Sequence, residues 1–324
     1  MREITDYQRQ IAQAVEQFIA NNKEESLYAP VNYILSIGGK RTRPALLLMA
    51  TDLFDGDSNE AINCALAVEV FHNFTLLHDD IMDHAPLRRG NVTVHERWGI
   101  NEAILSGDVM MVQAVQLMMQ CPDGVLRDVL EVFNVTAVEV CEGQQMDMDF
   151  EKRSDVSIAE YIKMIELKTS ALLAGAMKIG ALIGGATKVD AELIYEFGRN
   201  LGISFQIKDD ILDVYGDQEK FGKQVGGDII ENKKTYLMLN ALALAEGNIK
   251  ESLVEWISKE KFEAATKVSA VKEIYNTLEV REHTEAVMNK YYESAISNLR
   301  AMSLSEEKKA PLFTLARQLF ERED

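Results

Sequence analysis

Residues 73–83, NFTLLHDDIMD, and residues 203–213, ISFQIKDDILD, share one pattern, an apolar turn followed by a DDxxD acidic cluster. On an α-helix the first and fifth positions of such a cluster lie one turn apart on one face. The carboxylates of Asp79 and Asp83 would therefore repel each other unless a cation lies between them. Carboxylate oxygens suit Mg²⁺, which commonly binds one or two carboxylates together with substrate phosphates. The two segments predict helices that each present a site for magnesium and a diphosphate.

A single DDxxD cluster is equally compatible with a solvated acidic helix face. Here each copy directly follows apolar residues, including Leu76 and Leu77 in the first and Phe205 and Ile207 in the second. The carboxylates should therefore lie where a buried helix meets a cavity. Two such copies in one chain favour a shared binding function over two unrelated surface patches.

The rest of the chain has the periodicity of helices. Proline, the main helix breaker, occurs at positions 30, 44, 86, 122 and 311. In the long proline-free span, apolar residues recur at helical spacing, as at Leu193, Ile194 and Phe197. Turn signals such as DGDSN at 55–59 interrupt the pattern, but none is long enough to be a linker. We expect an all-α fold, a large single-domain helical bundle spanning residues 1–324.

Charge and composition restrict the classes of function. The 324 residues carry a formal net charge of -18, without a basic run that would indicate a nucleic-acid surface. Hydrophobic residues make up 47% of the chain, enough for a sizeable core. The sequence shows neither a signal peptide nor a membrane span. Because of this charge we expect no nucleic-acid partner. The cysteines at 64, 121 and 141 form no CxxC pair, so we interpret them as buried thiols of a cytoplasmic protein.

Basic residues complement the acidic clusters. The stretch GGKRTRP places Lys40 and Arg43 after a flexible glycine pair and beside a proline that can open a helix. Arg88 and Arg89 follow the first acidic cluster, and arginine forks match phosphate oxygens. Alone, either group could consist of ordinary helix-end cations. Their position beside acidic clusters in an acidic chain indicates phosphate binding.

Other candidate ligands are weaker on sequence alone. They are Lys168, Thr169, Gln206, Lys223 and Lys233. His72 precedes Asp79 by two helical turns on nearly the same face, a spacing equally compatible with a phosphate contact and with a hydrogen-bonded interior histidine. Neither GKQVGGD nor GGKRT satisfies the GxxxxGK[ST] pattern, which argues against a nucleoside-triphosphate site.

Taken in order, GGKRTRP, LLHDDIMD with RRG, ELKT, FQIKDDILD, and GKQVGGD with NKKT resemble the motifs of the trans-isoprenyl diphosphate synthases, the polyprenyl synthetase family. The similarity is to the short-chain geranylgeranyl or farnesyl diphosphate synthase type and covers about residues 28–240. It implies the isoprenoid synthase type of helical bundle, a homodimer, and condensation of isopentenyl diphosphate with an allylic diphosphate (dimethylallyl, geranyl or farnesyl). The allylic substrate ionises, the alkene attacks the cation, and a proton is lost as diphosphate is released.

The resemblance also implies a role for each motif residue. The Mg²⁺ ligands on the allylic diphosphate, for two or three ions in all, would be Asp79, Asp83 and Asp209. The cations that neutralise this diphosphate would be Arg88, Lys168, Lys223 and Lys233. The ligands of isopentenyl diphosphate would be Lys40, Arg43, His72 and Arg89. The neighbours of the reacting carbons would be Thr169 and Gln206.

Product length is expected to depend on Phe74 and Thr75, five and four places before Asp79. In the family the growing tail passes this turn, and bulky side chains there form the floor of its cavity. Phenylalanine followed by a small residue, with no insertion in the first DDxxD, resembles the geranylgeranyl type. Farnesyl-type members carry two aromatics or an insertion, and long-chain members a small residue at the position of Phe74. Geranylgeranyl diphosphate is the expected product, with farnesyl diphosphate or a longer polyprenyl diphosphate as the alternative.

Two other functions remain as alternatives. A terpene cyclase of the same architecture would carry one DDxxD with an NSE-like second motif, and it would not need GGKRTRP. A non-catalytic subunit of a heteromeric synthase would have lost the acidic motifs, which are intact here. Turnover of isopentenyl diphosphate by the purified chain discriminates among the three.

Overall fold

The computed structural model describes residues 2–23, 25–216 and 226–322. Their fold is helical, as predicted, and the β structure of the described residues is one hairpin of two-residue strands. The chain divides into two compact units. Unit 1 comprises Met1–Val138, Leu172–Tyr195 and Met302–Pro311, and unit 2 comprises Glu139–Ala171, Glu196–Ala301 and Leu312–Asp324.

Unit 1 contains the first acidic cluster. Its own elements are α1 (Ile4–Asn21), α2 (Ala29–Ser36), α3 (Thr42–Leu53), α4 (Ile62–Met82), β1 (Leu87–Arg88), β2 (Asn91–Val92), α5 (Val94–Trp98), α6 (Ile100–Met118) and η1 (Asp123–Val125). Almost all of α9 (Ala171–Ile183) also belongs to it. Three further helices of the described residues are divided between the two units: α7 (Leu126–Lys152), α10 (Lys188–Tyr215) and α17 (Glu306–Glu321).

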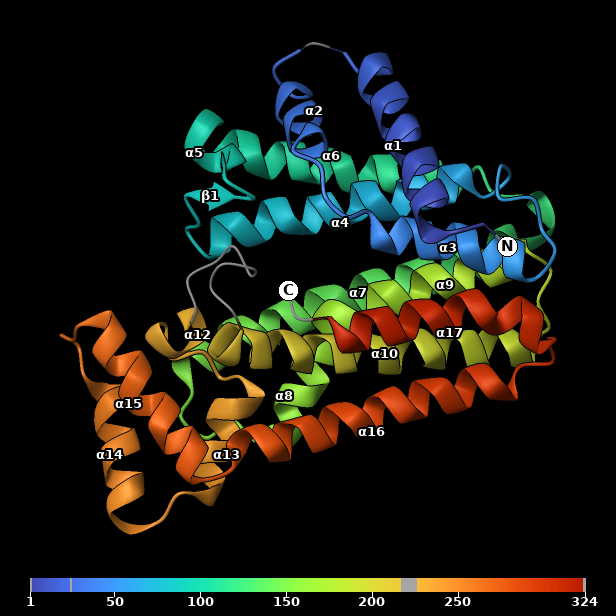
Figure 1. Ribbon diagram of the computed structural model, residues 1–324. Coiled ribbons are helices and arrows are strands. Elements are labelled where there is room, and N and C mark those ends of the chain that lie inside the picture. The colour runs from blue at the N-terminus through green and yellow to red at the C-terminus, as the bar shows by residue number, and fades with distance from the viewer. Residues whose placement is uncertain (1, 24, 217–225, 323–324) are drawn as a thin grey trace. The chain divides into compact units, whose positions relative to one another are not determined.

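Helix α4 is the central element of unit 1. About two turns near its start, from Cys64 to Phe71, are buried on all sides, because apart from Glu69 the sequence there is apolar around the whole helix. Along its length α4 packs against α6, and it also packs against α1 and α3 (Figure 1). Cys64 Sγ contacts Met118 O at 3.8 Å, so the start of α4 lies beside the end of α6. The polar carboxyl end of α4 is thereby carried on a rigid, buried base.

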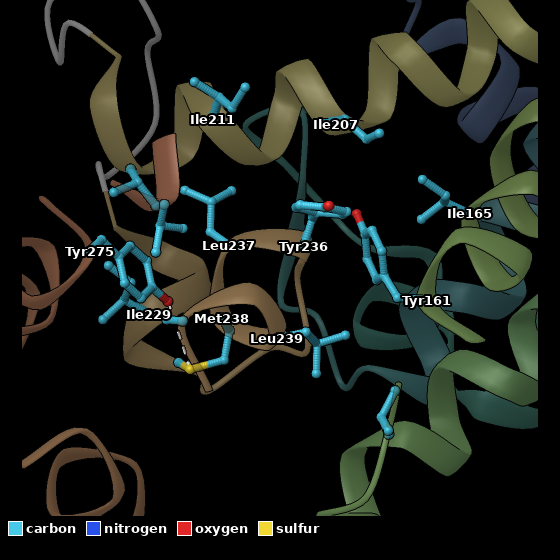
Figure 2. Close-up of a cluster of buried hydrophobic side chains, with 14 of the residues drawn as sticks. Tyr161, Ile165, Ile207, Ile211, Ile229, Tyr236, Leu237, Met238, Leu239 and Tyr275 are labelled. Atoms are coloured by element: carbon cyan, nitrogen blue, oxygen red, sulfur yellow. Dashed lines mark hydrogen bonds between the residues drawn. The ribbon is translucent and has the colours of Figure 1, made fainter. Parts of the chain in front are cut away.

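Unit 2 contains the second acidic cluster. Its own elements are α8 (Ile158–Ile165), η2 (Glu166–Ser170), α12 (Gly227–Ile230), α13 (Tyr236–Leu244), α14 (Gly247–Ser258), α15 (Ala264–Thr277) and α16 (Val280–Ala301). A hydrophobic core lies below α10, where Ile207 and Ile211 point toward the residues of α13 (Figure 2). Tyr275 of α15 closes this core and donates a weak hydrogen bond to Met238 Sδ at 3.7 Å (Figure 2).

Two local details differ from what the sequence indicates. Pro311 lies inside α17 instead of at a helix boundary, although Pro30 and Pro44 occupy first turns, where a missing N–H costs nothing. The interpretation of the cysteines as buried thiols is wrong for Cys141, which is exposed on α7 because its helical position faces away from the core. In the described part of the chain, no helix is long and apolar enough to cross a membrane.

Candidate active site

The first acidic cluster lies at the carboxyl end of α4. The helix ends at Met82, and its C-cap residue Asp83 donates its N–H to Asp79 O at 2.9 Å. The Asp79 side chain is 17% exposed, whereas that of Asp80 is 2% exposed. Because the carboxyl end of a helix carries partial negative charge, carboxylates placed there need positive charge nearby. Part of that charge comes from Arg88.

A β-hairpin positions Arg88. Strands Leu87–Arg88 and Asn91–Val92 pair antiparallel, and Arg89 and Gly90 form the turn between them with φ of 54° and 76°. Positive φ at both central residues is the geometry of a tight two-residue hairpin. The usual Asn-Gly or Asp-Gly signature is missing, so no strands were predicted here. The hairpin fixes the direction in which Arg88 leaves the backbone.

Arg88 joins the two adjacent carboxylates of the first cluster. Its Nε and Nη2 donate to Asp80 Oδ1 at 2.8 and 2.5 Å, and Nη2 also donates to Asp79 Oδ2 at 3.4 Å. Burial raises the pKa of Asp80, and its hydrogen bonds from Arg88 oppose that rise. The buried Asp80 thus holds Arg88 beside the more exposed Asp79.

A basic cluster surrounds the start of α3. Arg41, the N-cap residue, is left-handed with φ 47°, and a Cβ at Gly39 would lie 2.6 Å from Arg89 Nη1. Gly39 therefore allows the Arg89 guanidinium to cover the backbone of the GGKRTRP stretch. Arg43 Nη1 lies 3.4 Å from His72 Nε2 on α4. The structure thus brings together three of the four predicted isopentenyl diphosphate ligands, and Lys40 is exposed at the edge of the same stretch.

His72 is neutral in this environment. Burial holds its pKa well below the ordinary value, and the charges of Arg43, Arg89 and Arg88 lower it further. A neutral imidazole can accept the hydrogen bond that Arg43 donates. His72 is therefore an interior histidine with a polar partner inside a cluster of cations, and its contact with phosphate stays a prediction.

Glu69 is a buried member of this cluster that sequence reasoning missed. Its side chain is 5% exposed, and Asn73 Nδ2 donates to its Oε1 at 3.2 Å. Burial raises the pKa of Glu69, while the hydrogen bond from Asn73 and the charges of Arg41 and Arg43 lower it. A lone acidic residue inside an apolar stretch of α4 was the signal that could have found it. Glu69 partly compensates the gathered arginines.

Lys168 and Thr169 lie in η2, a π-helical turn. A Cβ at Gly143 of α7 would lie 2.3 Å from Lys168 N, so α7 lies directly against the backbone of this turn. Lys168 Nζ donates to Asp147 Oδ2 at 2.6 Å. Single π turns inside helices are frequent at functional sites. Asp147 was also missed, and the signal for it was an acidic residue four places after a helical glycine in GQQMD.

A hydrogen-bond chain connects this turn to the second acidic cluster. Thr169 Oγ1 donates to Gln206 Oε1 at 3.3 Å, and Gln206 Nε2 donates to Asp210 Oδ1 at 3.4 Å. The predicted neighbours of the reacting carbons are therefore in contact with each other. Gln206 can contact Asp210 because it lies one turn before it on the same face of α10.

Asp210, the middle residue of the second cluster, is buried. It accepts from Tyr161 OH at 2.5 Å and from Tyr236 N at 3.2 Å. The Tyr161 and Tyr236 rings lie close together below α10, at the top of the apolar core (Figure 2). Burial raises the pKa of Asp210 to about 7, and the charge of Asp228 adds to the effect. Like Asp80, this carboxylate secures its helix instead of facing outward.

The outer residues of the second cluster have different partners. Asp209 forms an ion pair with Arg322, whose guanidinium also lies 3.9 Å from the centre of the Phe205 ring. Asp213 Oδ2 accepts from Asp228 N at 3.1 Å, at the start of the short helix α12. Arg322 was missed because nothing in its sequence neighbourhood indicates a contact with α10. The Asp209 side chain is 35% exposed and therefore accessible.

Lys233 is held by acidic neighbours. Its Nζ lies 3.2 Å from Glu231 and 3.6 Å from Asp228. Burial lowers the pKa of Lys233, but these two carboxylates more than compensate and raise it. The lysine is therefore charged. The other predicted lysine of this region, Lys223, lies outside the described residues.

Phe74 belongs to an aromatic cluster of unit 1. Its ring centre lies 5.6 Å from that of Phe71 and 4.8 Å from that of His78, and Phe71 lies 5.4 Å from Phe133 of α7. Phe71 and Phe133 are buried, whereas Phe74 is half-buried. The hydroxyl of the small Thr75 side chain donates to His72 O at 2.8 Å.

The donor set fits a hard cation. Among the described residues no group of three or more His, Cys, Asp or Glu side chains is arranged to hold a metal. Carboxylate oxygens suit Mg²⁺, which takes one or two carboxylates and completes its shell with water and phosphate oxygens. Asp79 and Asp209 are carboxylates that already hold a cation, Arg88 and Arg322 respectively. Both clusters thus supply oxygen ligands suited to a metal bound together with a diphosphate.

Comparison with known proteins points to one family. The family model described as polyprenyl synthetase matches residues 24–278. The geranylgeranyl diphosphate synthase of Methanosarcina mazei is 42% identical over 241 residues, 74% of each chain. The short chain isoprenyl diphosphate synthase of Methanothermobacter thermautotrophicus is 36% identical over 330 aligned positions, with 100% of both chains covered.

Solved structures agree with the sequence matches. A crystal structure of a geranylgeranyl pyrophosphate synthase superposes with a TM-score of 0.95 at 42% identity, covering 100% of both chains. The geranylgeranyl pyrophosphate synthetase of Pyrococcus horikoshii superposes with a TM-score of 0.91 at 34% identity, covering 99% of this chain and 98% of the other. The predicted helical bundle is thereby confirmed.

Proposed function

Because the chain belongs to the polyprenyl synthetase family and is a prenyltransferase, we propose that it condenses isopentenyl diphosphate with an allylic diphosphate and releases geranylgeranyl diphosphate as its main product. The observation that carries this proposal is the common design of the two DDxxD clusters. In each, the middle aspartate is buried and fixed, and the first aspartate is accessible beside an arginine. Such carboxylates are preorganised for a charged ligand.

We assign the allylic diphosphate to the acidic clusters. Asp79, Asp83 and Asp209 are the proposed Mg²⁺ ligands, and when bound there Mg²⁺ supplies positive charge to the departing diphosphate. Arg88, Lys168 and Lys233 add fixed positive charge, with Lys223 proposed from sequence alone. Because carboxylate partners fix these three side chains, they need little reorganisation when the negative charge develops.

Isopentenyl diphosphate is assigned to the basic cluster of Lys40, Arg43, His72 and Arg89. The neutral His72 and the half-buried arginines there support an anion site with several donors. Thr169 and Gln206 are assigned to the reacting carbons. The partial negative charge on their hydroxyl and amide oxygens can stabilise an allylic cation. Excluding water from that cation is a further requirement of the reaction.

Product length is assigned to Phe74 with Thr75. The half-buried Phe74 ring, backed by Phe71 and His78, supports a floor of fixed position. The names of the similar proteins from Methanosarcina mazei and Pyrococcus horikoshii support the geranylgeranyl product.

We further propose that the whole chain acts as one domain and as a homodimer. Helices α7, α10 and α17 contribute residues to both units, which supports one domain. The outer face of α6 exposes large apolar side chains, which supports a dimer because monomers seldom expose such a stripe. These side chains are Ile100, Ile104, Leu105 and Val112, and the C-cap residue Met119 and Val135 and Val138 of α7 are exposed as well.

The test is an assay of the purified chain with isopentenyl diphosphate, Mg²⁺ and each allylic primer in turn. Mass analysis should show geranylgeranyl diphosphate, and a chelator should abolish its formation. Product from the purified chain alone would exclude the need for a different second polypeptide. Consumption of the allylic substrate without isopentenyl diphosphate would indicate a cyclase, and absence of product with every primer would overturn the proposal.

A further inference from the structure

His78 lies between the first acidic cluster and the proposed floor of the cavity. It immediately precedes Asp79 and follows Phe74 by one helical turn, so its ring and that of Phe74 share a face of α4. The two rings meet edge to face, with 4.8 Å between centres and 66° between planes. On its other side, Phe74 contacts Phe71. His78 therefore limits how far the Phe74 ring can tilt toward the carboxyl end of α4.

The ring of His78 is itself fixed by α6. A Cβ at Gly107 would lie 2.2 Å from His78 Nε2 and 2.6 Å from its Cδ2, so the ring occupies space that any other residue at 107 would fill. Nε2 also lies 3.3 Å from Ile104 O. A carbonyl oxygen only accepts, so Nε2 carries the hydrogen in this contact. Shape and hydrogen bonding thus hold the imidazole against α6.

We propose that His78 is a positioning residue for product length, which holds the Phe74 ring across the hydrocarbon cavity by resting on α6 at Gly107. This inference rests on the proposed function and on the assignment of Phe74 as the floor. His78 does not touch substrate in this account and acts only through Phe74. The packing of His78 on α4 against Gly107 on α6 therefore influences the length of the product.

The geometry predicts opposite changes in product length for His78→Ala and Gly107→Ala. His78→Ala removes the ring on the Asp79 side of Phe74, so Phe74 can tilt toward the acidic cluster and the cavity becomes shallower. Gly107→Ala drives the imidazole off α6 toward Phe74, so the Phe74 ring is pushed away from Asp79 and the cavity deepens. The first change should shorten the product by at least one five-carbon unit, and the second should lengthen it.

The experiment compares product lengths by mass spectrometry for the full chain carrying His78→Ala, His78→Phe, Phe74→Ala, or Phe74→Ala with His78→Ala. His78→Phe keeps a ring against Phe74 and should retain the wild-type length. The double variant should give the products of Phe74→Ala alone, since His78 acts through Phe74. Met118→Ala is the matched control, because it truncates a buried side chain at the far end of the same helix pair, beside Cys64.

Each outcome decides the inference. Wild-type or longer products from folded His78→Ala, or a double variant whose products differ from those of Phe74→Ala, would overturn it. If His78→Ala does not fold by circular dichroism, Gly107→Ala decides, and unchanged products from that variant also overturn the inference. Failure of the proposed function is distinguishable, because the wild-type chain would then make no prenyl diphosphate at all.

Discussion

Arg88 donates two hydrogen bonds to a single oxygen of Asp80, Oδ1, at 2.8 and 2.5 Å. The Asp80 side chain is 2% exposed and that of Arg88 27%, so the pair lies at the boundary between core and site. Asp80 thereby keeps the guanidinium beside Asp79 before any ligand binds. The equivalent aspartate of the second cluster, Asp210, holds two tyrosines instead.

Removing one partner of the Arg88–Asp80 ion pair should destabilise the fold. Arg88→Met would leave the Asp80 carboxylate buried without its partner, and we expect the free energy of unfolding to fall by about 3 kcal/mol. Asp80→Asn with Arg88→Met should lose less than the sum of the two single changes, because the uncompensated charge is then absent. Urea denaturation of the four proteins measures this coupling. Additive losses would show that the two side chains stabilise the fold independently.

Substitutions of Asp209 and Asp210 should have different effects, the first on activity and the second on stability. Asp209→Asn removes an accessible carboxylate, so we expect the melting temperature to stay nearly unchanged and kcat to fall at least about 100-fold. Asp210→Asn disturbs the buried contacts with Tyr161 and Tyr236, which should cost about 1–3 kcal/mol of stability. Thermal melts and steady-state kinetics on both variants test the assignment. Equal loss of activity without loss of stability in Asp210→Asn would contradict it.

The size of the side chains at the floor should control product length in both directions. Phe74→Ala should lengthen the products because the ring no longer blocks the cavity, and Thr75→Phe should shorten them because a second ring is added one residue closer to Asp79. Mass analysis of products from the three allylic primers measures the shift. Unchanged products from both variants would remove Phe74 and Thr75 from the floor.

Helical periodicity explains how much of the site could be predicted. In α4 and α10 the first and fifth positions of DDxxD share a face, and this alone distinguishes the accessible Asp79 and Asp209 from their buried neighbours. The spacing of His72 likewise placed it on the helix that carries Asp79. These residues were predictable because the relevant neighbours lie on one helix.

Contacts between elements distant in sequence could not be predicted. Asp147 meets Lys168 only because Gly143 lets α7 touch a π-helical turn, and Arg322 reaches Asp209 from the last described residue. Glu69 is recognisable as a counter-charge only after α3 and the hairpin have brought their arginines to α4. Such pairings depend on packing angles and loop geometry, which hydrophobic periodicity does not encode.

The apolar face of α6 should control oligomeric state. Leu105→Glu with Val112→Glu places charge on two residues that are 59% and 55% exposed, so the fold should survive while association weakens. Sedimentation should show a dimer for the wild type and a monomer for the variant. Val254→Glu on α14, where the side chain is 47% exposed, is the control and should leave the dimer intact. A wild-type monomer would refute the homodimer.

Gly143 should be intolerant of even one added methyl group. Its Cβ would lie 2.3 Å from Lys168 N and 2.8 Å from Leu167 C, which are backbone atoms that cannot turn aside like a flexible side chain. Gly143→Ala should therefore shift the π-helical turn, with a stability loss of about 1–3 kcal/mol.

Because that turn carries Lys168 and Thr169, we expect activity to fall together with stability, as an increase in KM for the allylic diphosphate and a decrease in kcat. Gly124→Ala is the matched control, since a Cβ there meets nothing within 4 Å. Denaturation and kinetics of both variants measure the two effects. Wild-type kinetics in a folded Gly143→Ala protein would show that the close approach of α7 is not needed to place these residues.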